Sequence, residues 1–437
     1  MDLVLAFVVF AGSMSYILSH GWLMVWGMLI GFAAFMATAL HRGFAFRALA
    51  DMAFRGAVKT LLVVRVLLII GVLTGIWRAS GTFAVLVVWG LKLVTPSLFV
   101  LEAFLLACVV SYAIGTSFGV AGTVGVTLMT LARSCGADEI ITAGAVMSGI
   151  YFGDRGSPAS SCALLVASVT ETELYDNLAR MLKTAIFPIL GCVVFYTFLS
   201  FRHPIVLPAE GAMSDLGGGF TLVPWVVLPA VIMLVLPLFK VKPIYAFLTS
   251  IACAFVCAVV FQGLSPVEAV SVGILGLHAE AGSPRALFNG GGLVSMINMC
   301  AVVFISGTYS GIFDGTGMLA DVQSWLSRMV DRLGAFPVMA CTGAVMDGVF
   351  CNQTIGVMMS AELLERPYLS GGRSRPEFAQ DIACSTVVLA GIIPTCIGCT
   401  VPYTMMGASL RAIPYAAYLY LVPICYLFTK KLMFKRL

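Results

Sequence analysis

Two opposite charges, Asp154 and Arg155, interrupt an otherwise apolar stretch of this chain and have the clearest chemical potential. They lie in YFGDRGSPASS (residues 151–161), in a sequence that is 60% hydrophobic and 11% charged. Charge at membrane depth is costly and usually marks an ion or proton pathway. Asp154 could bind a cation or a proton, with Ser157 as a further ligand and Arg155 as charge partner. A loop ion pair at the membrane surface is the structural alternative.

A second polar segment, GTSFGVAGTVG (residues 115–125), supplies hydroxyl groups and glycines that expose backbone carbonyls. Thr116, Ser117 and Thr123 offer neutral oxygen ligands, which suit a monovalent cation such as Na⁺. Small residues at this density also allow close helix packing, so a purely structural role for each hydroxyl stays open.

Asn352, Gln353 and Thr354 form a third polar cluster, directly after an apolar stretch that contains Asp347. Amides inside a membrane either hold helices together or contact a transported species. We expect contact with the ion or substrate. Asp314 and Asp347 are further candidate proton carriers, with helix-end or interface positions as the structural alternative.

Glu102 is the acid most deeply placed in an apolar run, LFVLEAFLLACVV. We expect a structural buried ion pair here, because an unpaired charge at this depth is costly. Arg65 and Arg78, in neighbouring apolar segments, are the candidate partners.

Catalytic and metal-binding patterns are not expected. Most of the 13 cysteines lie in apolar stretches, only four histidines occur, and no GKS or GKT loop is present. An intramembrane aspartyl enzyme would need a second acid close to Asp154. We therefore predict no enzyme, no metal site, no cofactor and no nucleic-acid partner.

The elements that must position these residues are predicted to be membrane-spanning helices. With 437 residues and 11% charge, the chain has too few charged groups for a soluble surface. Its apolar runs, about ten of roughly 17 to 22 residues, match the ~30 Å hydrocarbon core. The fold class is an all-α, polytopic integral membrane protein. The expected early spans are residues 3–18, 22–40, 60–77, 82–95, 97–114 and 184–201.

The second half of the sequence repeats the first. With a shift of 236 residues, a set of glycines and a proline coincide, and TGIW (74–77) faces SGIF (310–313). An odd number of spans between equivalent points would invert the second copy. The sequence thus predicts two inverted-topology repeats, with re-entrant hairpins and discontinuous helices. The matched positions are Gly71, Gly75, Gly81, Gly136 and Pro158 with Gly307, Gly311, Gly317, Gly372 and Pro394.

Charge indicates the topology. Basic clusters at 42–59, 240–242 and 430–436 are expected in the cytoplasm, with both chain ends, and the protein in the inner membrane. The chain then divides into an N-terminal hairpin with a basic loop, repeat one, a connecting region, and repeat two with a basic tail. Their ranges are 1–54, 55–203, 204–290 and 291–437.

Three motifs, TGIWRASGT (74–82), GTSFGVAGTVGV (115–126) and TAGAVMSGIYFGDRGSP (142–158), resemble the NhaC family of Na⁺/H⁺ antiporters. The resemblance covers residues 60–200 well and the second half weakly. It implies inward-pointing hairpins, discontinuous helices and exchange of sodium for protons, with an organic anion in malate/lactate-exchanging relatives. The family pattern GDKMSPLSDTTN reads GDRGSPASSCAL here, so Ser161 stands in place of the second acid.

Two functions follow from this resemblance and from the residues above. The first is exchange of Na⁺ for H⁺ at Asp154. The alternative is Na⁺-coupled symport or exchange of a small organic acid or amino acid on the same fold. The partners are then Na⁺, H⁺ and the lipid bilayer, with a small organic anion or amino acid in the second case, and a homodimer by analogy alone.

Overall fold

Helices make up nearly all of the fold in this computed structural model. Within the described residues no strand is formed, and a single β-bridge joins Leu277 to Gly290. This agrees with the predicted all-helical class. The described residues are 2–20, 22–158, 160–205, 219–239, 241, 243–280, 283, 285, 288–317 and 320–433.

Three of the described helices are long and apolar enough to cross a membrane: Met24–His41, Leu174–Arg202 and Leu293–Phe313. A fourth span results if the bent pair 46–58 and 63–79 is counted as one. The remaining apolar helices have 10–17 residues, fewer than the ~20 that a straight span needs. The fold is that of a polytopic membrane protein whose helices are often short or broken.

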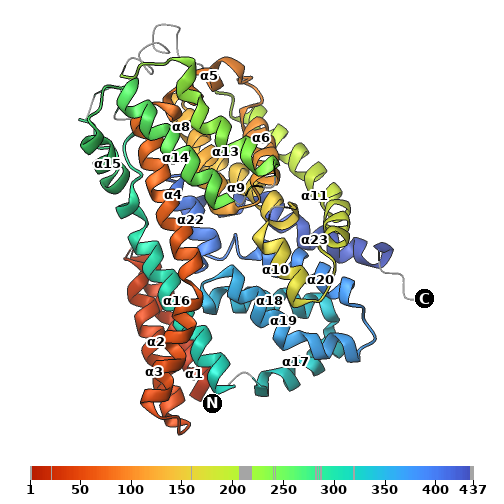
Figure 1. Cartoon of the computed structure of the whole chain (residues 1–437). Helices are drawn as coiled ribbons and strands as arrows, with labels where there is room; N and C mark the ends of the chain where they lie inside the picture. The colour runs from red at the N-terminus through yellow and green to blue at the C-terminus, as the bar shows by residue number, and fades with distance from the viewer. Residues whose placement is uncertain are drawn as a thin grey trace.

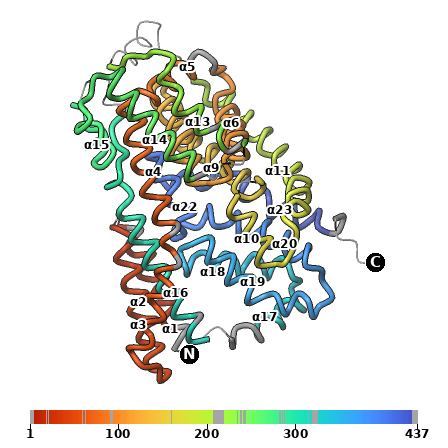
Figure 2. The backbone as a smooth tube through the Cα atoms, viewed as in Figure 1, coloured from red at the N-terminus to blue at the C-terminus, as the bar shows by residue number. Residues whose placement is uncertain are grey.

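A column of helices from both halves of the chain stands on one side of the molecule (Figure 1). It contains α1 (Asp2–Ser19), α2 (Met24–His41), α3 (Phe46–Lys59) and α16 (Ile297–Thr316), and α4 (Leu61–Ala79) continues it upward (Figure 2). Glycines allow the close approach of α3 and α16, since a Cβ atom on Gly56 would lie 2.1 Å from the carbonyl oxygen of Gly307. Such small-residue contacts are typical of helices packed in a membrane.

The rest of the first half contains the helices that were expected as spans, with breaks between and within them. A loop follows Ile114, a π-helical turn lies inside the next helix, and a second loop follows Gly156. The elements are α5 (Thr82–Leu93), α6 (Phe99–Ile114), α7 (Ser117–Val120), η1 (Ala121–Gly125), α8 (Val126–Ser134), α9 (Glu139–Gly156), α10 (Ser161–Val169) and α11 (Leu174–Arg202).

The connecting region and the second half are also helical. The connecting elements are η2 (Pro224–Val227), α13 (Leu228–Leu238), α14 (Pro243–Val260), α15 (Pro266–Leu275) and η4 (Leu293–Met296). The second half adds α17 (Ala320–Leu333), α18 (Ala335–Phe350), α19 (Gln353–Ser370), α20 (Arg375–Cys384), α21 (Thr386–Leu389), α22 (Ile397–Met405), η5 (Leu410–Tyr415) and α23 (Ala417–Met433).

Helix ends in the two halves fall 236 residues apart at several places. α4 and α16 begin at Leu61 and Ile297, and α10 and α22 correspond at both their first and last residues. α9 and α20 also begin 236 residues apart, each after a capping side chain. Left-handed backbone recurs at the same spacing, in pairs at Gly81 and Gly317, Gly115 and Cys351, and Gly136 and Gly372.

Helices α6 and α9 are packed almost backbone to backbone. A Cβ atom on Gly149 would lie 2.5 Å from Cβ of Ala107, and one on Gly153 would lie 2.1 Å from the backbone carbon of Ser111. Only glycine permits this approach, so these two positions fix how α9 lies on α6. The last turn of α9 carries Asp154 directly beside this contact.

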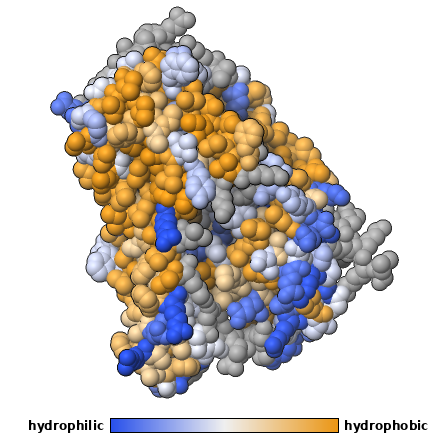
Figure 3. Space-filling view, in the orientation of Figure 1, coloured by the Kyte–Doolittle hydropathy of each residue, from blue (hydrophilic) through white to orange (hydrophobic). Residues whose placement is uncertain are grey.

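The outer surface agrees with a lipid environment. Figure 3 shows hydrophobic side chains across most of the visible face, with hydrophilic ones gathered mainly toward its lower end. Large apolar side chains such as Val194, Phe198 and Phe428 are more than half exposed. Exposed apolar surface of this extent is unusual for a soluble protein.

Candidate functional site

Asp154 lies buried at the point where elements of both halves meet. Its Oδ1 accepts a hydrogen bond from the backbone N–H of Ser117 at 3.3 Å, and its Oδ2 accepts one from Nε2 of Gln353 at 3.1 Å. Only 3% of the residue is exposed. The structure therefore brings together three residues that the sequence indicated separately.

Both partners of Asp154 begin a helix after a break. Gly115 takes a left-handed conformation and Thr116 an extended one, so that α7 restarts at Ser117. Cys351 and Asn352 repeat this pair of conformations before α19 restarts at Gln353. The free N–H groups at such helix starts carry partial positive charge, which stabilises a nearby carboxylate.

Two predicted ligands serve as helix caps instead. Oγ1 of Thr116 accepts from the N–H of Gly119, and Oδ1 of Asn352 accepts from the N–H groups of Thr354 and Ile355. A capping side chain satisfies the otherwise unpaired donors of a helix start. Thr116 and Asn352 therefore define the direction of the two helices that reach Asp154.

The remaining predicted hydroxyls have backbone partners or are exposed. Oγ1 of Thr123 donates to the carbonyl oxygen of Gly119 at 2.6 Å, and Oγ of Ser157 donates to that of Tyr112 at 2.6 Å. The side chain of Thr354 is exposed. Their role as ligands of an ion stays a prediction.

Arg155 was expected to be the charge partner of Asp154, and the structure places its guanidinium elsewhere. Successive residues on a helix are rotated by about 100°, so neighbouring side chains face different directions. Arg155 is buried and donates to groups on other helices, all of them formally neutral. Its partners are the carbonyl oxygens of Met181 and Ala383, the hydroxyls of Thr184 and Tyr418, and the sulfur of Cys384.

Asp347 is a second buried acid, on α18. Among the described residues neither of its carboxylate oxygens has a hydrogen-bond partner. The side chain packs against the backbone of α19, where a Cβ atom on Gly356 would lie 2.0 Å from its Oδ1. Asp154 and Asp347 both lie close enough to Tyr151 to act on it electrostatically. Asp314 belongs to α16, and its side chain lies outside the described residues.

Glu102 does not form the predicted buried ion pair. Its two carboxylate oxygens accept from the backbone N–H of Thr95 at 3.2 and 3.0 Å, which folds the side chain back to the start of α6. Glu102 is only partly buried, so it needs no cationic partner. The guanidinium of Arg78 instead donates to the backbone carbonyls of Phe288 and Asn289.

One buried charge network was not anticipated from the sequence. Asp381 on α20 accepts from the hydroxyls of Tyr368 and Tyr426 at 2.7 and 2.8 Å, and it pairs with Lys430, which also bridges to Glu377. Because Lys430 follows a long apolar run, the sequence suggested a cytoplasmic tail rather than a buried pair. This network joins α20 to α23 and is structural.

No group of three or more His, Cys, Asp or Glu side chains in the described part of the chain could hold a metal ion. The cysteines are all free, and most are buried among apolar groups. The site at Asp154 thus contains one carboxylate and hydrogen-bond donors from the starts of two helices that follow a break. Such a site can bind a proton or a small cation.

Comparison with known proteins agrees with this chemistry. The chain is 24% identical to the malate-2H⁺/Na⁺-lactate antiporter of Bacillus subtilis, over 82% of this chain and 78% of the relative. It is 27% identical to an uncharacterised Na⁺/H⁺ antiporter of Haemophilus influenzae (88% and 85% covered), and 23% to the Na⁺/H⁺ antiporter NhaC of Alkalihalophilus pseudofirmus (82% and 79%). The model of the Na⁺/H⁺ antiporter family matches residues 2–201 and 149–430, and the chain belongs to that family.

Proposed function

We propose that this protein exchanges Na⁺ for H⁺ across the cytoplasmic membrane by alternating access, and that both ions use Asp154. The proposal rests on one observation. A buried carboxylate receives neutral donors from both halves of the chain, and the described residues place no cationic side chain on it. A membrane transporter, rather than an enzyme, is also what the family comprises.

The chemistry of exchange follows from the cost of burying charge. An ionised carboxylate in a low-dielectric site is unstable unless a cation or a proton neutralises it. Na⁺ and H⁺ would then compete for Asp154. Either one, when bound, lowers the free-energy cost of the conformational change that exposes the site to the other side of the membrane. Because each excludes the other, movement of one ion in one direction is coupled to the return of the other.

Gln353 is suited to sense which ion is bound. Its Nε2 donates to Oδ2 of Asp154 and to the carbonyl oxygen of Val387 at 2.9 Å. A donor in this position stabilises the ionised carboxylate. Rotation of the amide would present its oxygen instead, and oxygen ligands are what Na⁺ requires.

Two inverted repeats would supply the moving parts. The helix ends and left-handed residues that recur at a spacing of 236 support this arrangement. Ser117 and Gln353, the two partners of Asp154, are themselves equivalent at that spacing. In this scheme the restarted helices α7 and α19 are the tips of re-entrant or discontinuous elements that alternately open to each side.

Asp347 is proposed as a second proton carrier, because its buried carboxylate has no hydrogen-bond partner among the described residues. It would be neutral for most of the cycle. Asp314 is proposed only by its place on α16. No cofactor is required in this scheme, and we propose cytoplasmic chain ends because the basic clusters follow the positive-inside rule.

Transport by reconstituted protein tests the proposal. In proteoliposomes with an acidic interior, added Na⁺ should drive proton efflux, and the apparent KM for Na⁺ should rise as the pH falls because protons compete. Asp154→Asn should abolish the exchange. Asp51→Asn is the matched control, since Asp51 is exposed and pairs with Arg55 at the surface. Full Na⁺-driven proton movement in the Asp154→Asn variant would overturn the assignment.

A further inference from the structure

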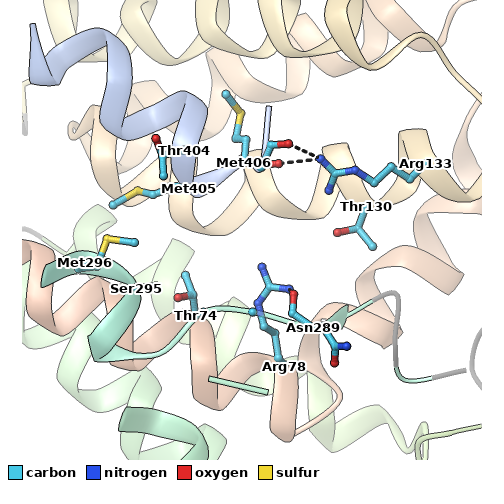
Figure 4. A pocket seen from close by; sticks show the side chains of 13 residues that line it. Thr74, Arg78, Thr130, Arg133, Asn289, Ser295, Met296, Thr404, Met405 and Met406 are labelled. Atoms are coloured by element: carbon cyan, nitrogen blue, oxygen red, sulfur yellow. Dashed lines mark hydrogen bonds between the residues drawn. The ribbon is translucent and has the colours of Figure 1, made fainter. Parts of the chain in front are cut away.

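A cavity of about 220 Å³ lies at the far end of α8 from the Asp154 site, between α4, α8 and the segments 289–296 and 404–407 (Figure 4). Two arginines, Arg78 and Arg133, reach it from opposite sides. Hydroxyls of Thr74, Thr130 and Thr404 also line it. None of its described lining residues is Asp or Glu.

Arg78 is held rigidly at this cavity. It is 9% exposed, and its Nη1 donates to the carbonyl oxygens of Phe288 and Asn289 at 2.8 Å each. The N–H of Gly292 donates to Gly71 at 2.9 Å, which fixes this segment against α4. Among the described residues the buried Nε of Arg78 has no hydrogen-bond partner. A buried guanidinium donor without an acceptor is costly, and the charge of Arg78 is compensated only in part by the two carbonyl groups.

Arg133 faces Arg78 across the cavity and is also fixed (Figure 4). Its Nη2 donates to the carbonyl oxygens of Met406 and Gly407 at 3.1 and 2.9 Å. Its Nε pairs with Glu139, whose side chain is 49% exposed, at 2.9 Å. Because this ion pair is open to solvent, it contributes little to stability and is screened by salt.

Both arginines line the same cavity. Two fixed like charges in a shared cavity repel, and an anion between them would turn that repulsion into attraction on both sides. The planar fork of arginine matches the two oxygens of a carboxylate. The hydroxyls of Thr74 and Thr130 already donate to their own helices, so toward the cavity they can accept from a hydroxyl group of the anion but do not donate to its carboxylate oxygens.

We propose that this cavity binds a small carboxylate anion between Arg78 and Arg133. A volume of about 220 Å³ is below the ~300–1,000 Å³ of pockets for drug-sized ligands, so the anion must be small. The site is distinct from Asp154: Ser117 and Thr130 are thirteen residues apart on α7–η1–α8, which is about 20 Å of helix. The proposal goes beyond exchange of Na⁺ and H⁺.

Calorimetric titration of the purified full chain tests the carboxylate site, with malate, lactate and inorganic phosphate as separate probes at constant Na⁺. We expect a carboxylate to bind more tightly than phosphate. Arg133→Gln should weaken that binding about 10-fold or more, as the loss of a charge-assisted hydrogen bond implies. Arg133→Lys keeps the charge but loses the planar pair of donors. Its affinity for the carboxylate should lie between that of Arg133→Gln and that of the unaltered chain.

Controls separate this proposal from the ion site. Arg55→Gln, at an exposed surface arginine, should leave carboxylate binding unchanged. Asp154→Asn should keep carboxylate binding even though ion exchange is lost, so the two proposals fail independently. The carboxylate site is overturned if neither acid binds the unaltered chain, if phosphate binds more tightly than both acids, or if Arg133→Gln binds as tightly as the unaltered chain.

Discussion

The break between α6 and α7 and the break between α18 and α19 have the same backbone and different side chains. In each, a left-handed residue is followed by an extended capping residue and a restarted helix. The first break provides a backbone N–H at Ser117, whereas the second provides an amide at Gln353. Similar backbone geometry thus carries different chemistry, and only the pair of breaks together forms the site.

The buried acids of the two halves lie at positions that are not equivalent. Asp154 lies on α9, and the residue 236 positions later is Ala390. Asp347 lies on α18, and the residue 236 positions earlier is Ser111. Each half therefore contributes one acid at a position where the other half has a small neutral residue. The proposed function assigns Asp154 to the exchanged ions and Asp347 to a further proton.

Replacing each acid by its amide tests this division most strongly. Asp154→Asn should lose Na⁺ binding, because the remaining groups are neutral. Asp347→Asn should keep Na⁺ affinity within about twofold and move about one proton fewer per Na⁺, since it removes a proton carrier and no ligand. Calorimetry measures the Na⁺ affinity, and reversal potentials in proteoliposomes measure the number of protons moved per Na⁺. Loss of Na⁺ binding in Asp347→Asn would place both acids in one site.

Enlarging Gly153 should disturb the first half severely. Gly153→Ala brings a Cβ atom within 2.1 Å of the backbone of Ser111, so α9 must move away from α6. Overpacking of this kind costs about 1–3 kcal/mol, and the movement displaces Asp154. The midpoint temperature of thermal unfolding and the affinity for Na⁺ should both fall. Gly12→Ala, with no atom within 4 Å of the new Cβ, is the matched control; equal stability of the two variants would contradict the packing.

Removing the amide of Gln353 should weaken the ion site without destroying it. Gln353→Ala loses one charge-assisted hydrogen bond to Asp154, which corresponds to about a 10-fold rise in the KM for Na⁺. Thr354→Ala alters the exposed neighbouring side chain and should have no effect. An unchanged KM in Gln353→Ala would mean that the second half does not contribute to the ion site.

The smallest effect is expected from the two helix caps. Asn352→Ala and Thr116→Ala each remove a side chain that accepts from the start of a helix, at a cost of about 1 kcal/mol. The free energy of unfolding, measured by chemical denaturation, should fall by similar amounts in both variants if the breaks are equivalent. A loss confined to one variant would show that the two breaks are stabilised differently.

Much of the fold and part of the site could be predicted from the sequence. Periodic glycines and polar interruptions indicated the helix breaks at 115–125 and 351–356, because glycine and capping residues have strong local preferences. Asp154, Ser117 and Gln353 were each singled out from the sequence, whereas their contacts with one another come from the structure. Local sequence patterns are sufficient to predict a helix break, because glycine and capping residues act directly on the backbone.

The directions of side chains could not be predicted in the same way. Arg155 follows Asp154 directly, yet its partners lie on α11, α20 and α23, which only the tertiary packing brings near. Glu102 and Arg78 were matched by their depth in apolar runs, and each finds a backbone partner instead. Proximity in sequence says little about contact across helices.

The glycine contact between α6 and α9 also limits how the transporter can move. Two helices whose backbones touch at Gly149 and Gly153 cannot slide past each other without steric clash, so they form one rigid unit that carries the acid. In the proposed cycle the motion would then be that of the two restarted helices, α7 with Ser117 and α19 with Gln353, relative to this unit. The carboxylate would stay on the fixed pair α6 and α9, and the ion would leave when one of the restarted helices moves away from it.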